Sequence, residues 1–248
     1  MDSGFYVAYA GLAARMEALD IVASNLANAS TAGFKGQTPF YRALSAAQQE
    51  QFITPLNQAV NQFGVLGGSR PDLRSGSLGP TGNNTDLAIE GSGFFTIQAA
   101  GGLRYTRNGS FRLNAARQLV TEDGDPVLGG DAAKTKPVVL PSGSLTISAD
   151  GTLSVDGALV AKLHLAKFAP GTPLVPEGNS DYIAPAGSEQ AATDSSVRQG
   201  MLESSNLNPV EGSISLVLLQ RQSDLLARAL STLNTDFNRA ATQDVPRV

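Results

Sequence analysis

Apolar residues recur at every seventh position along the N-terminal part of the chain. The first row is Phe5, Leu12, Leu19 and Leu26, and a second row, offset by four residues, is Tyr9, Met16 and Ala23. Alternating steps of four and three predict a helix with one apolar seam, running from about Ser3 to Asn28. The opposite face carries small residues rather than charges: Ala8, Gly11, Ala14 and Ala18. Small side chains let other helices approach closely, although an ordinary core-facing helix would show a similar pattern.

The C-terminal part shows the same repeat after a helix-start signal. Asn208, Pro209 and Glu211 stand at the cap, first and third helical positions, where each residue type is favoured. The apolar positions on the seam are then Leu219, Leu226, Leu230, Leu233 and Phe237. The polar positions between them are mostly uncharged, as expected of a face that meets other protein. We therefore predict a second long helix.

Together the two ends predict an α+β fold, with long N- and C-terminal helices paired as a coiled coil and an all-β middle domain inserted between them. A single such pair would leave apolar and small-residue faces in water, whereas many copies side by side would cover them. The pattern therefore favours an assembly subunit over an isolated enzyme.

Between the helices the apolar pattern changes from the helical to the strand period. From Asp86 onward short β-rich runs are separated by turn pairs such as Asp150-Gly151 and Asp156-Gly157, which predicts a barrel or sandwich of short strands. Residues 36–82 show no clear period, and we expect an extended connector with a short helix near residues 46–52. The predicted parts are the N-terminal helix (1–35), the connector (36–82), the β-rich domain (83–204) and the C-terminal helix (205–248).

Composition narrows the function further. Charged residues make up 16% of the chain and the formal charge is −4, which argues against broad nucleic-acid affinity, since that needs clustered lysine and arginine. The absence of cysteine excludes disulfides, zinc–thiolate sites and cysteine nucleophiles. The N-terminus lacks the features of a cleaved secretory signal, and no run approaches the roughly 20 apolar residues of a membrane span. The chain is therefore cytoplasmic or exported by another route.

Candidate chemistry is sparse. His164 is the only histidine, and with no second histidine or cysteine to complete a metal site we expect a structural or surface role. The acidic turn at residues 122–125 lacks the further ligands of a calcium loop. Arg104, Arg107 and Arg112 alternate with aromatic residues and could contact nucleic acid, but at this net charge a strand face or a salt-bridge surface between subunits is favoured. We predict no catalytic, cofactor-binding or metal-ligating residue.

Several motifs resemble those of one family, the flagellar rod–hook axial proteins. They occupy residues 24–35 (SNLANASTAGFK), 86–95 (DLAIEGSGFF), 105–111 (YTRNGSF), 118–124 (QLVTEDG) and 200–206 (GMLESSN), in the order the family has them. Within the family, the length and residues 125–129 and 147–153 are most similar to the proximal rod proteins. The distal rod proteins share nearly every block and are the alternative, and residues 38–81 match least well.

The resemblance implies a structural subunit of the bacterial flagellar basal-body rod. Such a subunit would assemble through its terminal helices into a helical tube that spans the periplasm and transmits torque. Its partners would be other copies of itself, other rod proteins and the flagellar type III export apparatus, through which it would pass without a cleaved signal peptide. No enzyme activity, cofactor, nucleic acid or small-molecule substrate is expected. A secreted β-rich adhesin is a less favoured alternative, and a hydrolase would need an acid–base set that we do not find.

Two groups of residues follow as candidate sites. One is an assembly interface on the two helices, made of Phe5, Leu12, Met16, Leu19, Leu26, Leu219, Leu226, Leu230, Leu233 and Phe237. The other is the motif turn that leads from the first helix into the connector, made of Asn25, Asn28, Thr31, Gly33 and Phe34.

Overall fold

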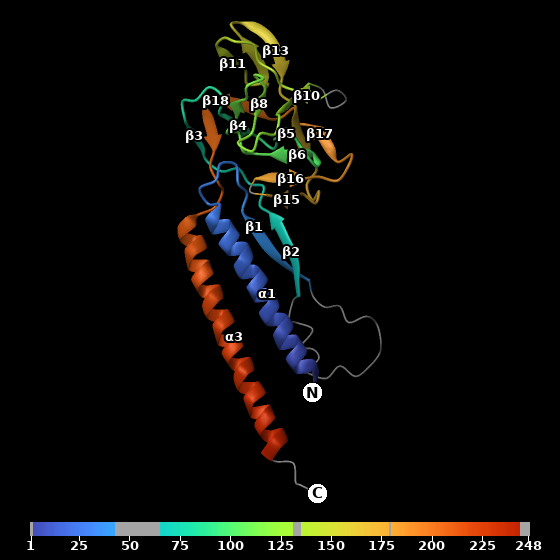
Figure 1. Ribbon diagram of the computed structural model, residues 1–248, viewed down its shortest axis with the longest axis vertical. Helices are drawn as coiled ribbons and strands as arrows, with labels where there is room; N and C mark the ends of the chain where they lie inside the picture. The colour runs from blue at the N-terminus through green and yellow to red at the C-terminus, as the bar shows by residue number, and fades with distance from the viewer. Residues whose placement is uncertain (1, 43–64, 131–134, 179, 244–248) are drawn as a thin grey trace. The chain divides into compact units, whose positions relative to one another are not determined.

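A computed structural model describes residues 2–42, 65–130, 135–178 and 180–243 (Figure 1). The short helix predicted near residues 46–52 lies outside these ranges. The chain forms two units: residues 1–26, 37–69 and 208–248 make up a helical unit, and residues 27–36 and 70–207 make up a β-rich unit.

The helical unit contains the two terminal helices and one small sheet. Helix α1 spans Asp2–Ala27 and helix α3 spans Pro209–Gln243; strands β1 (Gln37–Arg42) and β2 (Val65–Pro71) pair with each other. The predicted cap of α3 is confirmed, because the backbone N–H of Val210 donates to Asn208 Oδ1 at 3.0 Å. Neither of these described helices is long and apolar enough to cross a membrane.

The predicted pairing of α1 and α3 as a coiled coil is wrong. Of the α1 side chains that the structure describes, Ala14 and Ala18 on the small-residue face are buried, at 7% and 1% exposure, whereas Tyr9 and Met16 of the predicted seam are 56% and 58% exposed. In α3, Leu230 is buried, but Val210, Ile214, Val217, Leu218 and Leu225 are exposed. A seven-residue repeat identifies an apolar stripe without identifying what covers it. In α1 two small residues are fully packed, while Tyr9 and Met16 of the predicted seam are exposed.

The β-rich unit confirms the predicted inserted β domain, built from many short strands rather than from one continuous barrel. A six-stranded sheet has the order β15-β16-β6-β5-β14-β17, and β11, β12 and β13 form a separate three-stranded sheet. The strands of the six-stranded sheet are β5 (Phe94–Ala99), β6 (Gly102–Thr106), β14 (Leu165–Phe168), β15 (Val175–Glu177), β16 (Asp181–Ile183) and β17 (Glu189–Ala191). Those of the three-stranded sheet are β11 (Leu145–Ile147), β12 (Thr152–Val155) and β13 (Ala158–Lys162).

The remaining strands of this unit form two-stranded ladders. These are β3 (Leu78–Pro80) with β19 (Met201–Glu203), β4 (Leu87–Glu90) with β18 (Ser196–Gln199), β7 (Arg112–Leu113) with β8 (Leu119–Val120), and β9 (Leu128–Gly129) with β10 (Lys136–Pro137). In the first two ladders, strands from the start of the unit pair with strands from its end. The entry and exit of the chain are thereby held together.

Local sequence explains the turns and the core. The predicted turn at Asp156-Gly157 joins β12 to β13 with both residues at positive φ, 51° and 82°, as a type I′ hairpin requires. The main core packs residues such as Leu87, Phe95, Ile97 and Leu153, each at most 1% exposed. A second cluster holds aromatic rings in edge-to-face contact, with the Phe94 and Phe168 ring centroids 5.7 Å apart.

Candidate functional site

The motif turn begins at the end of α1, where the side chain of Asn25 forms the two backbone hydrogen bonds that a neighbouring strand would form. Asn25 Nδ2 donates to the carbonyl oxygen of Gln37 at 2.7 Å, and Asn25 Oδ1 accepts from the N–H of Gln37 at 2.8 Å. Both backbone groups of the first β1 residue are therefore satisfied by one amide side chain. This contact fixes where the chain reverses after α1.

In the β-rich unit, the rest of the motif turn is held by short-range bonds and by a close backbone approach. The N–H of Thr31 donates to the carbonyl of Asn28 at 3.0 Å, and the N–H of Phe34 donates to that of Thr31 at 3.3 Å. Gly33 has a φ of +68°, and a Cβ there would lie 2.2 Å from the carbonyl carbon of Arg107. Only glycine fits this position. The next side chain, Phe34, is buried.

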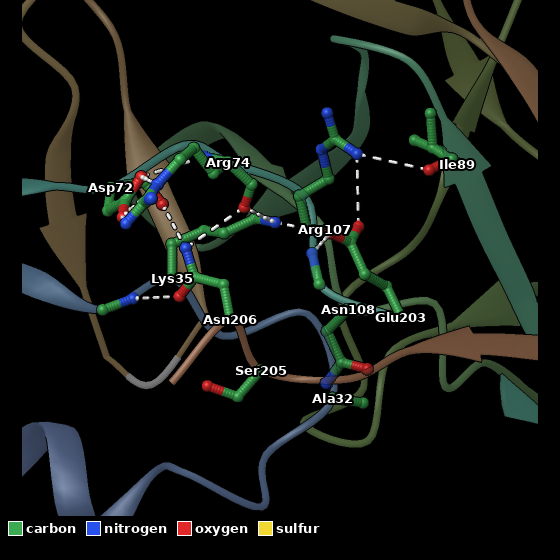
Figure 2. Close-up of polar contacts among 12 residues, drawn as sticks. Ala32, Lys35, Asp72, Arg74, Ile89, Arg107, Asn108, Glu203, Ser205 and Asn206 are labelled. Carbon is green, nitrogen blue, oxygen red and sulfur yellow. Dashed lines mark hydrogen bonds and ion pairs between the residues drawn. The ribbon is translucent and has the colours of Figure 1, made fainter. Parts of the chain in front are cut away.

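Directly after this turn lies an ion cluster of Lys35, Arg107 and Glu203, whose side chains are 0%, 2% and 0% exposed. Lys35 Nζ donates to Glu203 Oε1 at 2.5 Å, and Arg107 Nη1 lies 3.2 Å from Glu203 Oε2. Figure 2 shows both cations joined to the one carboxylate, with Lys35 also donating to the carbonyl of Arg74. Two basic side chains thus share one carboxylate away from water.

Backbone groups complete the cluster and tie further segments to it. Arg107 donates to the carbonyls of Ile89 and Gly91, at 3.3 and 2.6 Å, and its guanidinium carbon lies 5.0 Å from the centroid of the Phe94 ring. Glu203 Oε1 accepts the N–H of Gly76 at 2.8 Å. The cluster therefore joins the motif turn, the segment after β2, the β4–β5 turn, the end of β6 and the end of β19.

A neighbouring amide reinforces the same junction. Asn206 Oδ1 accepts the N–H of Gly36 at 2.9 Å, and Asn206 Nδ2 donates to the carbonyls of Asp72 and Arg74 at 2.7 and 3.1 Å. The Asn206 side chain therefore bonds the N-terminal motif turn and the segment after β2 to the segment that precedes α3 (Figure 2).

In this cluster, burial and the charge of Glu203 shift the pKa values of the basic side chains in opposite directions. Removal from water lowers the pKa of Lys35 from its ordinary value, while the hydrogen bond and negative charge of Glu203 oppose that shift. Burial likewise lowers the pKa of Arg107, against the attraction of Glu203. Such an arrangement is stable only while every member is present, because one missing partner leaves an uncompensated buried charge. The chemistry is that of a structural clamp.

A cavity of about 340 Å³ lies elsewhere in the β-rich unit, beside His164. His164, for which we expect a structural or surface role, is buried: Nδ1 lies 3.2 Å from the carbonyl oxygen of Gly130, and Nε2 contacts Glu189. Glu189 also accepts a hydrogen bond from the Tyr105 hydroxyl at 2.9 Å. The histidine thus joins the β13–β14 connection to β17 and to the end of β9.

The three arginines of the predicted basic row do not share a surface. Arg104 pairs with Glu177, Arg107 with Glu203, and Arg112 donates to the carbonyl oxygen of Glu122 at 2.8 Å. Each arginine therefore binds a different partner within the same chain. The interpretation as a strand face or as a surface for another subunit is wrong for Arg107, because its side chain is buried.

The predicted assembly residues have mixed surroundings in the isolated chain. Leu230 is buried, Met16 is exposed, and the intermediate positions are Leu12, Leu19, Leu26, Leu219 and Leu226. The side chains of Phe5, Leu233 and Phe237 lie outside those that the structure describes. Their role in assembly stays a prediction.

Sequence reasoning missed the ion cluster. Lys35, Arg107 and Glu203 lie in three different motif blocks, at residues 24–35, 105–111 and 200–206. The available signal was that each block carries a charged residue among small and apolar ones. The pairing of the three residues needed the topology that brings β19 beside β3.

Two family models match the chain. Residues 5–35 match "Flagella basal body rod protein", and residues 88–155 match "Flagellar hook protein FlgE/F/G D1 domain". The first match ends on Lys35 and the second includes Arg107, so both contribute to the ion cluster.

Similar proteins carry related names along most of their length. The chain is 32% identical to "Flagellar basal-body rod protein FlgF" of Caulobacter vibrioides, over 100% of both chains. It is 34% identical to the protein of the same name from Mesorhizobium japonicum, over 89% of both chains. It is 30% identical to "Flagellar basal-body rod protein FlgG" of Buchnera aphidicola, over 94% of this chain and 96% of that one.

Proposed function

The chain belongs to the family of flagellar basal-body rod proteins, as a structural subunit of the rod, and we propose that it builds the proximal segment. Similarity to the FlgF proteins over the whole chain supports this position. The FlgG proteins are similar to a lesser degree, at 28% to 30% identity, and a distal position is the second candidate.

We propose that the subunit assembles through its terminal helices, and the observation that carries this is their exposed apolar surface. Val210, Ile214, Leu218 and Leu225 of α3 are 67%, 56%, 53% and 67% exposed, and Met16 of α1 is 58% exposed. Apolar surface of this extent on neighbouring helical turns is typical of an interaction face. In a rod subunit, the partners that cover it are other subunits.

The arrangement suits an open-ended polymer. When a patch on one copy binds a different patch on the next copy, the contact repeats without closing and generates a helical tube. The proposed contact residues on the helices are those of the predicted interface together with the exposed residues of α3. We propose that the tube transmits torque through these helix contacts.

We also propose that the flagellar type III export apparatus is a partner before assembly. Family membership supports this proposal, since the rod lies beyond the cytoplasm. The ordered positions of the subunits within the rod then depend on contacts with other rod proteins.

The test is one charge on an exposed apolar position of α3. Leu225→Asp places a carboxylate where the isolated chain has no packing to lose, so the isolated protein should keep its helicity and thermal midpoint. Burial of one leucine contributes about 2 kcal/mol at each contact, and loss of this contribution in every subunit should abolish rods in electron micrographs and swimming in soft agar. Gln220→Asp, which adds the same charge at an exposed polar position on another face of the helix, is the matched control and should assemble.

Normal swimming of the Leu225→Asp strain would contradict a role for this face in assembly. Position along the rod needs a separate measurement: antibody labelling of purified basal bodies should mark the inner end. Labelling of the outer end would favour the distal candidate.

A further inference from the structure

A second cavity in the β-rich unit, of about 420 Å³, lies against the ion cluster. Its lining includes Arg107, Arg74, Leu73, Phe94, Phe168 and Ser92. Arg107 is 2% exposed, and its Nε has no hydrogen-bond partner among the residues that the structure describes. A buried guanidinium N–H without an acceptor is uncommon, because the unmade bond costs free energy.

The charge balance around this cavity is positive. Lys35 and Arg107 share the single carboxylate of Glu203, whereas Arg74 has its own partner in Asp72, with Nε 2.8 Å from Oδ2. One positive charge in the cluster is therefore uncompensated by these contacts. A carboxylate entering the cavity would supply the missing negative charge close to the guanidinium groups of Arg107 and Arg74, which line it.

The walls restrict what kind of carboxylate fits. Phe94, Phe168 and Pro170 give the cavity apolar sides, and Leu73 at its edge is 42% exposed. An anion without an apolar part would leave these walls in contact with water. The cavity thus suits an acidic side chain that stands between apolar neighbours.

We propose that this cavity receives the acidic side chain of Glu211 from a second copy of this chain. Glu211 is exposed, as are the adjacent apolar side chains of Val210 and Ile214. No lysine or arginine stands within four positions of Glu211, whereas Asp224, the other described exposed acid of α3, has Arg221 and Arg228 at helical spacing. Glu211 is therefore the acid of α3 that lacks a local cation and carries the apolar flanks.

The inference rests on the proposed packing of subunits in the rod, so its first test does not involve assembly. The probe is 4-fluorobenzoate, a carboxylate on an apolar ring, titrated into the isolated full-length chain and followed by fluorine NMR. Saturable binding is expected. The neutral 4-fluorobenzamide should bind about tenfold more weakly, since one charge-assisted hydrogen bond distinguishes the two probes. Equal binding of both probes, or binding of neither, would overturn the carboxylate site.

Variants at the rim locate the probe. Leu73→Asp places a carboxylate at the edge of the cavity and should reduce benzoate binding about tenfold, whereas Leu73→Asn, of the same size and without the charge, should leave it within about twofold. Neither substitution touches the ion cluster, and tyrosine fluorescence checks that both variants fold. Unchanged binding to Leu73→Asp would place the probe elsewhere and contradict the assignment.

The second test identifies the occupant in assembled rods. Because the chain has no cysteine, paired cysteines report contacts without background. Val210→Cys with Ser92→Cys should give disulfide-linked oligomers on mild oxidation, and Val210→Cys with Ser142→Cys, at an exposed residue outside the cavity lining, should not. Adding Glu211→Gln should lower the yield of the first pair severalfold, whereas adding Asp20→Asn should not.

The outcomes separate the two proposals. Rods of the Val210→Cys, Ser92→Cys variant that assemble without a disulfide between these two positions overturn Glu211 as the occupant. A chain that binds the benzoate probe but never forms rods contradicts the proposed subunit packing and, with it, the assignment of Glu211, while the carboxylate site stands on the first test.

Discussion

In the β-rich unit, Lys35, Arg107 and Glu203 are buried together, whereas in the helical unit Leu218 and Leu225 lie in water. Most folded proteins place charge outside and apolar residues inside. The β-rich unit reverses the first rule and meets the cost with hydrogen bonds inside the same chain. The helices reverse the second rule, and in the proposed rod other subunits would cover their exposed apolar side chains. The two units therefore differ in where the compensation lies: largely within the chain for the buried charges, and in other subunits, as proposed above, for the exposed apolar residues.

The largest effect that would sharpen this contrast comes from removing the shared carboxylate. Glu203→Gln leaves two buried cations without their anion and should lower the free energy of unfolding by about 3–5 kcal/mol. Urea denaturation of the isolated chain, followed by tyrosine fluorescence, measures the loss. Glu90→Gln, which breaks the exposed pair with Arg198, should leave the transition almost unchanged. Similar midpoints for both variants would show that the cluster does not hold the unit together.

The next effect tests which face of α1 packs within the chain. Ala18 is 1% exposed, so Ala18→Leu overfills its site and should destabilise the helical unit by about 1–3 kcal/mol. Met16→Leu, at a position that is 58% exposed, should change stability by less than about 0.5 kcal/mol. Thermal unfolding followed by circular dichroism at helical wavelengths compares them. If Met16→Leu changed stability more than Ala18→Leu, the small-residue face would not be the packed face of α1.

A smaller effect concerns the junction between α1 and β1. Asn25→Ala removes two hydrogen bonds to the backbone of Gln37 and should cost about 1–2 kcal/mol. The local readout is hydrogen exchange of the Gln37 amide, which should become at least several times faster. Asn25→Asp keeps an acceptor for that amide but loses the donor, and should give intermediate exchange. Protection that persists in Asn25→Ala would mean that the β1–β2 ladder alone orders this turn.

The smallest effect lies at the rim of the ion cluster and depends on pH. The Arg74 guanidinium lowers the pKa of Asp72, so this pair stabilises the fold above the unfolded pKa of about 3.9 and loses that contribution as pH falls through the folded value. Arg74 is largely exposed, so screening by solvent keeps the effect small. Asp72→Asn should therefore lower stability slightly at pH 7 and flatten its decline in acid, as measured by urea midpoints across pH. If the urea midpoint of Asp72→Asn fell in acid as steeply as that of the parent chain, ionisation of Asp72 would not contribute to stability.

The sequence predicted those features that depend on neighbours along the chain. Asn208 and Pro209 specify where α3 starts, and Asp156-Gly157 specifies a hairpin, because caps and tight turns are local chemistry. The coiled coil was mispredicted because apolar periodicity describes one helix and not its partner. The ion cluster was missed because Lys35 and Glu203 meet through strand pairing across 168 positions. No short-range pattern encodes a contact of that length.

The pairing of β3 with β19, and of β4 with β18, also has a consequence for the time at which the β-rich unit can fold. Translation releases the chain from its N-terminus, so Lys35 and Arg107 leave the ribosome long before Glu203. Until then the early strands lack their partners and the two cations lack their carboxylate. Closing so long a loop is slow, because the entropy cost comes first and the stabilising contacts form only once the loop has closed. The junction between the start and the end of the β-rich unit therefore closes only after nearly all of the polypeptide has been made.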